Sequence, residues 1–176
     1  FAAKAAPGYR RAKDIIRLIN SVSQLVASDE RTRDVMSVVF VPNYDVSTAQ
    51  HLIPATDLSE QISTAGLEAS GTGNMKFMMN GALTIGTMDG ANIEQVGPEN
   101  MFIFGARVEE LDRMREEGSY DPQAVMRADA RLEKALGHLV DGSLPTSDGS
   151  KFDDLYHSLV QPGGDAYFVL HDFDAY

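Results

Sequence analysis

A glycine-rich run in the middle of the chain places the strongest limit on the local fold. It extends from Glu68 to Asn80 and reads Glu-Ala-Ser-Gly-Thr-Gly-Asn-Met-Lys-Phe-Met-Met-Asn. Gly71 and Gly73 allow positive φ angles and a close approach of the backbone to a ligand. The residues from Asn74 onward have the composition of a short helix. A loop of free backbone N–H groups leading into a helix binds anions, most often phosphate. The run therefore predicts either a phosphate-binding turn or an ordinary tight turn before a helix.

Lys76 is the unusual residue of this run, because it lies between Met75 and the apolar stretch Phe77–Met79. Its position fits neither the P-loop pattern nor Gly-x-Gly-x-x-Gly, which would require glycine where Lys76 stands. A charged amine among Met and Phe is costly, so we expect burial to lower the pKa of Lys76. The neutral amine is also the form that condenses with an aldehyde. The alternative is a lysine whose charged end extends into water.

Composition limits the class of protein. The 176 residues suffice for one domain with a core, and 43% hydrophobic and 23% charged residues are ordinary for a globular protein. A net charge of −11 argues against nucleic acid as the main partner. No apolar stretch approaches the ~20 residues that cross a membrane, and the absence of cysteine excludes disulfides and fits a cytoplasmic protein. Because the chain opens at Phe1 with no signal peptide, we expect a piece of a longer polypeptide.

Helical and strand patterns alternate in the first two-thirds of the chain. Apolar residues at helical spacing predict an amphipathic helix over 10–27, and the β-branched run 35–41 predicts a strand buried on both faces. Other predicted elements are strands at 83–86 and 102–104 and helices at 47–52, 74–80, 89–94, 108–114, 121–139 and 152–159. This alternation predicts an α/β fold with a Rossmann-like parallel sheet and flanking helices.

The run from Glu68 to Asn80 closely resembles the pyridoxal-phosphate attachment signature of the glycogen, starch and maltodextrin phosphorylases. The resemblance covers about positions 4 to 105 and thins beyond them. It includes Lys4-Ala-Ala-Pro-Gly-Tyr9, Asn43-Tyr44 followed by Val46-Ser47, Asp57-Leu-Ser-Glu-Gln-Ile-Ser-Thr-Ala-Gly66 and Asn80-Gly-Ala-Leu-Thr-Ile-Gly-Thr-Met-Asp-Gly-Ala-Asn-Ile-Glu94. Phe1-Ala2-Ala3 departs from the glycine pair that the family often has before the lysine, so the local backbone there is in question.

The resemblance implies a two-domain enzyme of the GT-B type, with its active site between the domains. Residues 1–176 would form part of the C-terminal, cofactor-binding domain, and the N-terminal domain would be absent from this chain. The implied activity is pyridoxal-phosphate-dependent phosphorolysis of α-1,4-glucan to glucose 1-phosphate, in a cytoplasmic enzyme that is usually a homodimer. We expect this chain alone to fold without catalysing the reaction.

The resemblance also assigns roles to individual residues. Lys76 would hold the cofactor as an imine, while Thr72 and Gly73 would hold its phosphate and Tyr44 would lie against its ring. The glucosyl unit would be contacted by Glu68, Ala69, Ser70 and Gly71. Tyr9 resembles an aromatic residue at the mouth of the cleft.

Several alternatives remain open at this level. Thr72 and Gly73 could serve only the turn, Glu68 could be a partner in an ion pair, and Tyr44 could be an ordinary aromatic at a strand end. Asp89, Asn92 and Glu94 are expected to fix a loop and cap a helix rather than bind a metal. The four histidines are scattered, and we expect them to be structural or exposed. A pyridoxal enzyme of the aminotransferase kind and a fragment without catalytic function are the competing hypotheses.

Overall fold

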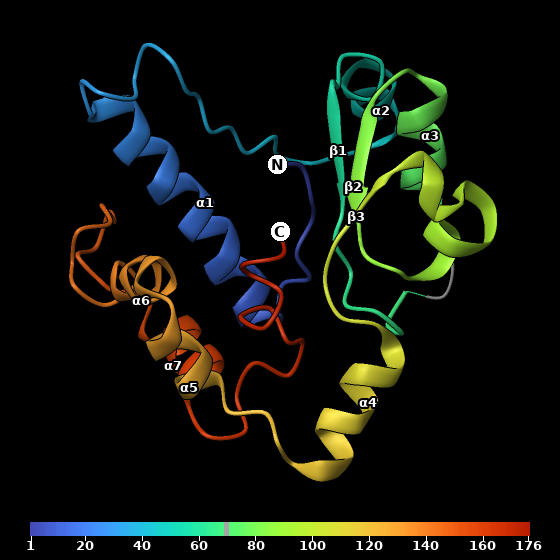
Figure 1. The fold of residues 1–176 in the computed structure, drawn as a ribbon. Coiled ribbons are helices and arrows are strands. Elements are labelled where there is room, and N and C mark those ends of the chain that lie inside the picture. The colour runs from blue at the N-terminus through green and yellow to red at the C-terminus, as the bar shows by residue number, and fades with distance from the viewer. Residues whose placement is uncertain (69–70) are drawn as a thin grey trace. The chain divides into compact units, whose positions relative to one another are not determined.

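The computed structural model describes residues 1–68 and 71–176 (Figure 1). These residues form two compact units. Unit 1 contains residues 1–45 and 126–164, and unit 2 contains residues 46–125 and 165–176. The described helices and strands confirm the predicted α/β class, with a parallel sheet and flanking helices.

Unit 1 is helical. It contains α1 (Arg10–Ser28), α6 (Ala130–Gly137) and α7 (Asp153–Val160), while α5 (Pro122–Ala128) runs across the sequence boundary between the units. α1 lies against α7, and its Arg17 guanidinium stacks 4.6 Å from the centre of the Phe152 ring. The buried apolar side chains of this unit are Leu132, Leu136, Leu139, Phe152, Leu155 and Val160.

Two sequence predictions in unit 1 are corrected. The single helix expected over 121–139 is interrupted at Asp129, whose carboxylate accepts a hydrogen bond from Arg131 N at 2.8 Å and caps α6. The strand expected at 35–41 is wrong: among the described residues its only ladder contact is a bridge between Val41 and Ala2. Val35 is 83% exposed, so the apolar run lacks the neighbouring strands that a buried strand needs.

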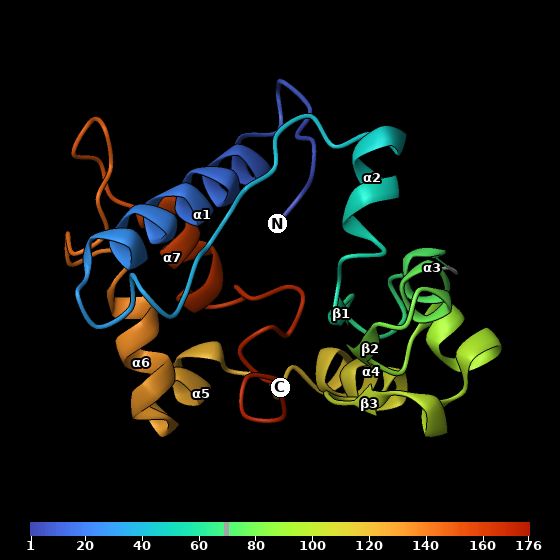
Figure 2. The ribbon, with the colours of Figure 1, turned by 90° about the horizontal axis from the view of Figure 1, so that it is seen from above.

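Unit 2 contains a three-stranded parallel sheet of order β1-β2-β3. The strands are β1 (Leu58–Gln61), β2 (Leu83–Gly86) and β3 (Phe102–Ile103). Helix α3 (Gly73–Met79) connects β1 to β2 and contacts both strands, as parallel pairing requires a crossover (Figures 1 and 2). The remaining elements are α2 (Val46–Leu52), a π-helical turn η1 (Asn92–Val96), a 3₁₀ turn η2 (Pro98–Asn100) and α4 (Val108–Glu117).

The covered face of this sheet carries small polar residues. Ser59 and Thr84 are register partners, and they are 4% and 1% exposed, respectively. Side chains alternate between the two faces of a strand, so Leu58 and its partner Leu83 lie on the other face, where they are 53% and 61% exposed. The small residues allow α3 to lie close to the strands.

The C-terminal residues complete unit 2. Asp165 is 3% exposed, and its carboxylate accepts hydrogen bonds from Val169 N and Leu170 N, each at 2.8 Å, and from the Tyr120 hydroxyl at 2.6 Å. Burial, together with this carboxylate, raises the pKa of the Tyr120 phenol. Beside this contact, a small core contains Ala65, Ala106, Leu111 and Phe168. Residues 165–176 are therefore held to the loop that follows β1.

Gly86 sets the spacing at the carboxyl end of β2. A Cβ atom at this position would lie 2.7 Å from the backbone oxygen of Gln61, in the neighbouring strand. We expect Gly86→Ala to lower the free energy of unfolding by about 1–3 kcal/mol, because the strands must move apart. Denaturant unfolding followed by circular dichroism measures this loss.

Gly137 provides the matched control for this substitution. A Cβ atom there meets no other atom within 4 Å, so Gly137→Ala should leave stability unchanged or raise it by up to about 1 kcal/mol. Equal stability of the Gly86→Ala and Gly137→Ala proteins would contradict the close strand contact.

Candidate functional site

The candidate site lies at the carboxyl ends of β1 and β2. Register pairs Gln61 with Gly86, so the loops that follow these two strands leave the sheet next to each other. Ligands of open parallel sheets bind outside this edge. The loop after β1 carries Glu68 and leads to α3, and the loop after β2 leads through Asp89 to η1.

These loops enclose a cavity of about 210 Å³. Apart from Gly71 and Gly73, the described lining residues carry polar side chains, and these are Gln61, Ser63, Glu68, Asn74, Thr87, Asp89 and Asn92. So many carboxylate, amide and hydroxyl groups around one small cavity suit a ligand that both donates and accepts many hydrogen bonds.

Asp89 holds the loop that carries Glu68. Its carboxylate is 7% exposed and accepts hydrogen bonds from Gly66 N at 2.9 Å, Glu68 N at 2.8 Å and Gly90 N at 3.0 Å. This confirms the expectation that Asp89 fixes a loop. The side chain of Glu94 lies outside the part of the chain that the structure describes.

A second set of buried polar contacts holds α3. Asn74, in the first turn of the helix, is 2% exposed, and its Nδ2 donates to Asn92 Oδ1 at 2.7 Å. Asn92 Nδ2 in turn donates to the backbone oxygen of Thr87 at 2.9 Å. Thr87 Oγ1 donates to the backbone oxygen of Ser63 at 2.6 Å. These contacts therefore link α3 to the loop after β2 and, through it, to the loop after β1.

Two glycines of the run line the cavity. Gly71 has a φ of +79°, and a Cβ atom there would lie 3.5 Å from Glu68 Oε1. At Gly73 a Cβ atom would lie 3.4 Å from the Gln61 side-chain amide. Both distances are ordinary contact distances, so the positive φ predicted for these glycines is confirmed at Gly71 alone, and their close approach to a ligand stays a prediction.

Lys76 lies on α3 and is exposed. The burial that we expected for this lysine is not found, and Phe77 and Met78, which follow it in α3, are themselves only half-buried. Lys76 is also not among the described residues that line the cavity. Its amine is thus accessible to a ligand on the outside of the helix.

The other predicted site residues are placed as follows. Thr72 immediately precedes α3, is exposed, and makes no capping hydrogen bond through its side chain. Tyr44 is half-buried and belongs to unit 1, whereas Thr72, Gly73 and Lys76 belong to unit 2. Ala69 and Ser70 lie outside the described residues.

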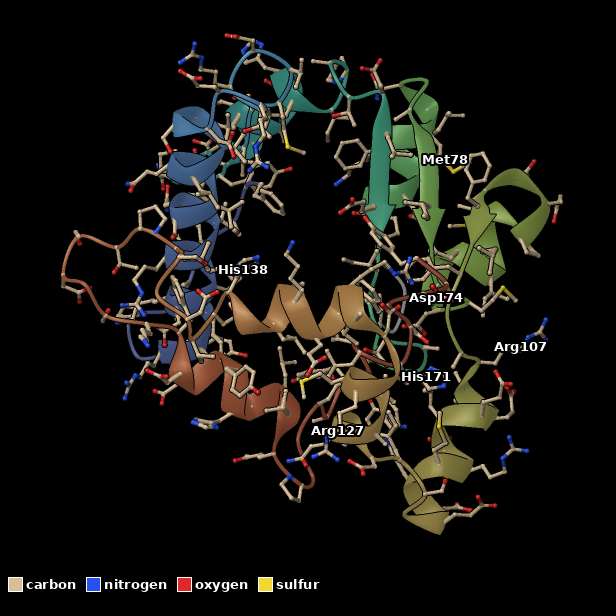
Figure 3. All side chains as sticks on the ribbon, turned by 60° about the vertical axis from the view of Figure 1, so that its left-hand side comes forward. Met78, Arg107, Arg127, His138, His171 and Asp174 are labelled. Atoms are coloured by element: carbon tan, nitrogen blue, oxygen red, sulfur yellow. The ribbon has the colours of Figure 1, made fainter. Side chains whose placement is uncertain are left out.

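The charge at the cavity is negative. Glu68 and Asp89 are both in its lining, and none of the described lining residues is basic. From Asp34 to Ala106 the sequence contains a single Lys or Arg, which is Lys76. The next basic residue is Arg107, exposed just before α4 (Figure 3). The cavity by itself therefore favours a neutral, hydroxyl-rich ligand over an anion.

Sequence reasoning did not assign Gln61, Ser63, Asn74 and Thr87 to the site. Gln61 and Thr87 reach the cavity through the pairing of β1 with β2, which no local pattern reveals. For Asn74 the sequence predicts only a local bond, because short polar side chains at a helix start bond to nearby backbone, as Asn74 Oδ1 does in accepting from Met75 N at 2.8 Å.

Among the described residues, no three His, Asp, Glu or Cys side chains group as a metal site would require. In the same part of the chain, every helix is too short or too polar to cross a membrane.

The fold and the cavity define an α/β protein with a largely polar cavity at the carboxyl edge of a parallel sheet, which is the edge where such folds bind ligands. Sequence comparison makes the class specific. The chain belongs to the carbohydrate phosphorylase family, whose sequence model matches residues 1–176. This confirms the family to which the glycine-rich run pointed.

Its relatives include proteins named glycogen phosphorylase. The chain is 53% identical over 179 residues to that of Chlamydia pneumoniae and 48% identical over 179 residues to that of Bacillus subtilis (strain 168). These matches cover 100% of this chain and 21% and 22% of the relatives, respectively. The muscle form from Homo sapiens is 48% identical over 176 residues, which is 98% of this chain and 20% of that protein. The chain thus spans about a fifth of the length of these relatives.

Asn92 offers a test of the buried contacts beneath α3. Asn92→Ala leaves Asn74 Nδ2 without its acceptor in a position that is 2% exposed. We expect the free energy of unfolding to fall by about 1–3 kcal/mol, because an unsatisfied buried group loses its hydration without compensation. Denaturant titration measures the change.

Asn100→Ala is the control, because Asn100 Nδ2 also donates to a backbone oxygen, at 2.7 Å, but is exposed. Water replaces that contact, so the loss should stay within about 0.5 kcal/mol. Losses of the same size in both proteins would mean that burial of the Asn74–Asn92 contact is not what stabilises α3.

Proposed function

We propose that the full-length protein is an α-glucan phosphorylase, which uses pyridoxal 5′-phosphate to convert α-1,4-glucan and phosphate into glucose 1-phosphate and a shortened glucan. The observation that carries this proposal is the polar cavity with Glu68 in its wall, directly before the helix that bears Lys76, in a chain of the carbohydrate phosphorylase family. The names of the relatives support the same substrate class.

The cavity would take the glucosyl unit. Glu68 would accept hydrogen bonds from sugar hydroxyls, and the backbone of Ala69, Ser70 and Gly71 would complete the contacts. An ionised carboxylate accepts from several donors at once, which matches adjacent hydroxyls of a pyranose. Support comes from the absence of positive charge in the described cavity lining, since a neutral sugar needs none.

The residues of α3 and its preceding loop fit the cofactor. Lys76 presents an exposed amine for covalent attachment, and Thr72 has a hydroxyl that makes no capping bond. Gly73 opens the helix, where backbone N–H groups lack intrahelical acceptors and can donate to phosphate. Tyr44 would lie against the ring. Once bound, the cofactor would supply a phosphate that serves as proton donor and electrostatic partner for the substrate phosphate.

Such a site would need positive charge that the described lining of the cavity lacks. Two phosphate groups at short range repel strongly when water is excluded, and Lys76 is the single basic residue between Gln61 and Ala91. The remainder of the enzyme would provide the cations. We infer that residues 1–176 are part of the C-terminal domain of a two-domain GT-B enzyme, a homodimer of the cytoplasm, and that this chain alone does not catalyse.

Lys76→Ala in the full-length protein tests cofactor attachment. The substitution should abolish the near-ultraviolet or visible absorbance of the bound cofactor, because no other amine is present in this run. Spectra of the purified protein, with cofactor content measured after denaturation, provide the measurement. Lys134→Ala, at an exposed lysine on α6, is the matched control and should retain full absorbance. Absorbance that persists in Lys76→Ala would refute the assignment.

Glu68→Gln tests sugar recognition. The neutral amide keeps the shape and loses a hydrogen bond to a charged acceptor, a loss of about 1.5–3 kcal/mol. We therefore expect kcat/KM for phosphorolysis to drop by roughly one to two decades, with cofactor content unchanged. Glu116→Gln, at an exposed position on α4, should leave both quantities unchanged. Loss of cofactor with intact sugar binding would reverse the roles of Glu68 and Thr72.

A further inference from the structure

Asp89 lies outside the attachment run and has no proposed contact with sugar or cofactor, yet it contacts the loop that carries Glu68. It is 7% exposed, and three backbone N–H groups converge on its carboxylate. We propose that Asp89 is a positioning residue, which holds Glu68 in the orientation that binds the sugar. This inference rests on the proposed function, because it assumes that Glu68 contacts the glucosyl unit.

The contact fixes the backbone on the N-terminal side of Glu68. Oδ1 of Asp89 accepts from Gly66 N and Oδ2 accepts from Glu68 N, so one carboxylate spans alternate peptide groups. Gly90 N donates to the same Oδ1, which holds the carboxylate to its own loop. Rotation of the peptide group between Leu67 and Glu68 would break the hydrogen bond from Glu68 N to Asp89 Oδ2.

The surroundings of the loop restrict it further. Ala65, just before Gly66, is 2% exposed in the core of unit 2, and a Cβ atom at Gly66 would lie 3.4 Å from Val108. The backbone that leads to Glu68 is therefore held by Asp89 and lies next to the core of unit 2.

A carboxylate suits this position better than an amide. Both carboxylate oxygens of Asp89 serve as acceptors, Oδ1 for Gly66 N and Oδ2 for Glu68 N. In addition, hydrogen bonds to an ionised acceptor are stronger than those to a neutral one. In Asp89→Asn one acceptor becomes an NH₂ group that faces an N–H donor. That variant releases one end of the loop while preserving the volume of the side chain.

The test is a double-substitution cycle in the full-length enzyme. Asp89→Asn alone should lower kcat/KM for phosphorolysis by about ten- to hundredfold, with cofactor absorbance retained. If Asp89 acts through Glu68, adding Asp89→Asn to Glu68→Gln should lower kcat/KM by no more than about twofold further. The proposal would be overturned if Asp89→Asn lowered kcat/KM as much in the Glu68→Gln protein as in the unsubstituted enzyme. Asp89 would then contact the sugar itself or act elsewhere. A loss of less than twofold in Asp89→Asn alone would overturn it as well.

Asp165→Asn is the matched control for a general structural effect. Asp165 is equally buried in the same unit and also accepts two backbone N–H bonds, but these come from Val169 and Leu170. Its effect on kcat/KM should add fully to that of Glu68→Gln, whatever it does to the melting temperature. Non-additive behaviour of Asp165→Asn as well would mean that the coupling reports stability alone, and it would overturn the positioning role.

Two further measurements keep the outcome decisive. Hydrogen exchange by mass spectrometry of the peptide that covers 64–68 should be at least about tenfold faster in Asp89→Asn, while that of α4 is unchanged. Unchanged exchange at 64–68 overturns the positioning role of Asp89, whatever the activity of the enzyme. Lack of activity of the parent enzyme on glucan would instead refute the proposed function. Should Asp89→Asn fail to fold, Asp89→Glu keeps both acceptors at a shifted position. It should show a smaller loss that is still non-additive with Glu68→Gln, and additive losses count against the proposal.

Discussion

The parallel pairing of β1 with β2 is the constraint on which the rest of unit 2 depends. A parallel pair cannot be joined by a tight turn, so the chain crosses the sheet through a loop and a helix. Because Gln61 and Gly86 are register partners, the loop that leads to α3 and the loop that leads to η1 begin side by side. Gly86 permits this, since the backbone oxygen of Gln61 occupies the space that any larger residue would need. The position of the site follows from this pairing.

A single loop after β2 then supports both halves of the candidate site. Asp89 binds the backbone ahead of Glu68, and Asn92 binds Asn74 at the start of α3. One set of contacts thus orients the proposed sugar residue, and the other orients the helix that carries the proposed cofactor lysine. Buried polar contacts of this kind are costly when incomplete and restrict the backbone when satisfied. The spacing between sugar and cofactor would therefore be fixed by residues that touch neither the lysine nor its cofactor.

Local patterns predicted the elements whose cause is local. α1 follows from helical spacing of apolar residues, α3 from the composition after Gly73, and β2 from a short β-branched run. The strand at 35–41 failed because an apolar run shows β propensity but not whether neighbours exist to pair with it. In the same way, the run predicted a ligand loop but not the exposure of Lys76 or the approach of Gln61 and Thr87. Those depend on strand register, which brings together residues far apart in the sequence.

We propose that Lys76 carries a cofactor whose phosphate, rather than its bond to the lysine, takes part in the reaction. Borohydride reduction of the full-length protein tests it most directly, because reduction makes the attachment permanent and peptide mass spectrometry then locates it. We expect to find the label on Lys76, and we expect the reduced enzyme still to form glucose 1-phosphate from glucan and phosphate. A label on another lysine, or complete loss of activity on reduction as expected of an aminotransferase, would contradict it.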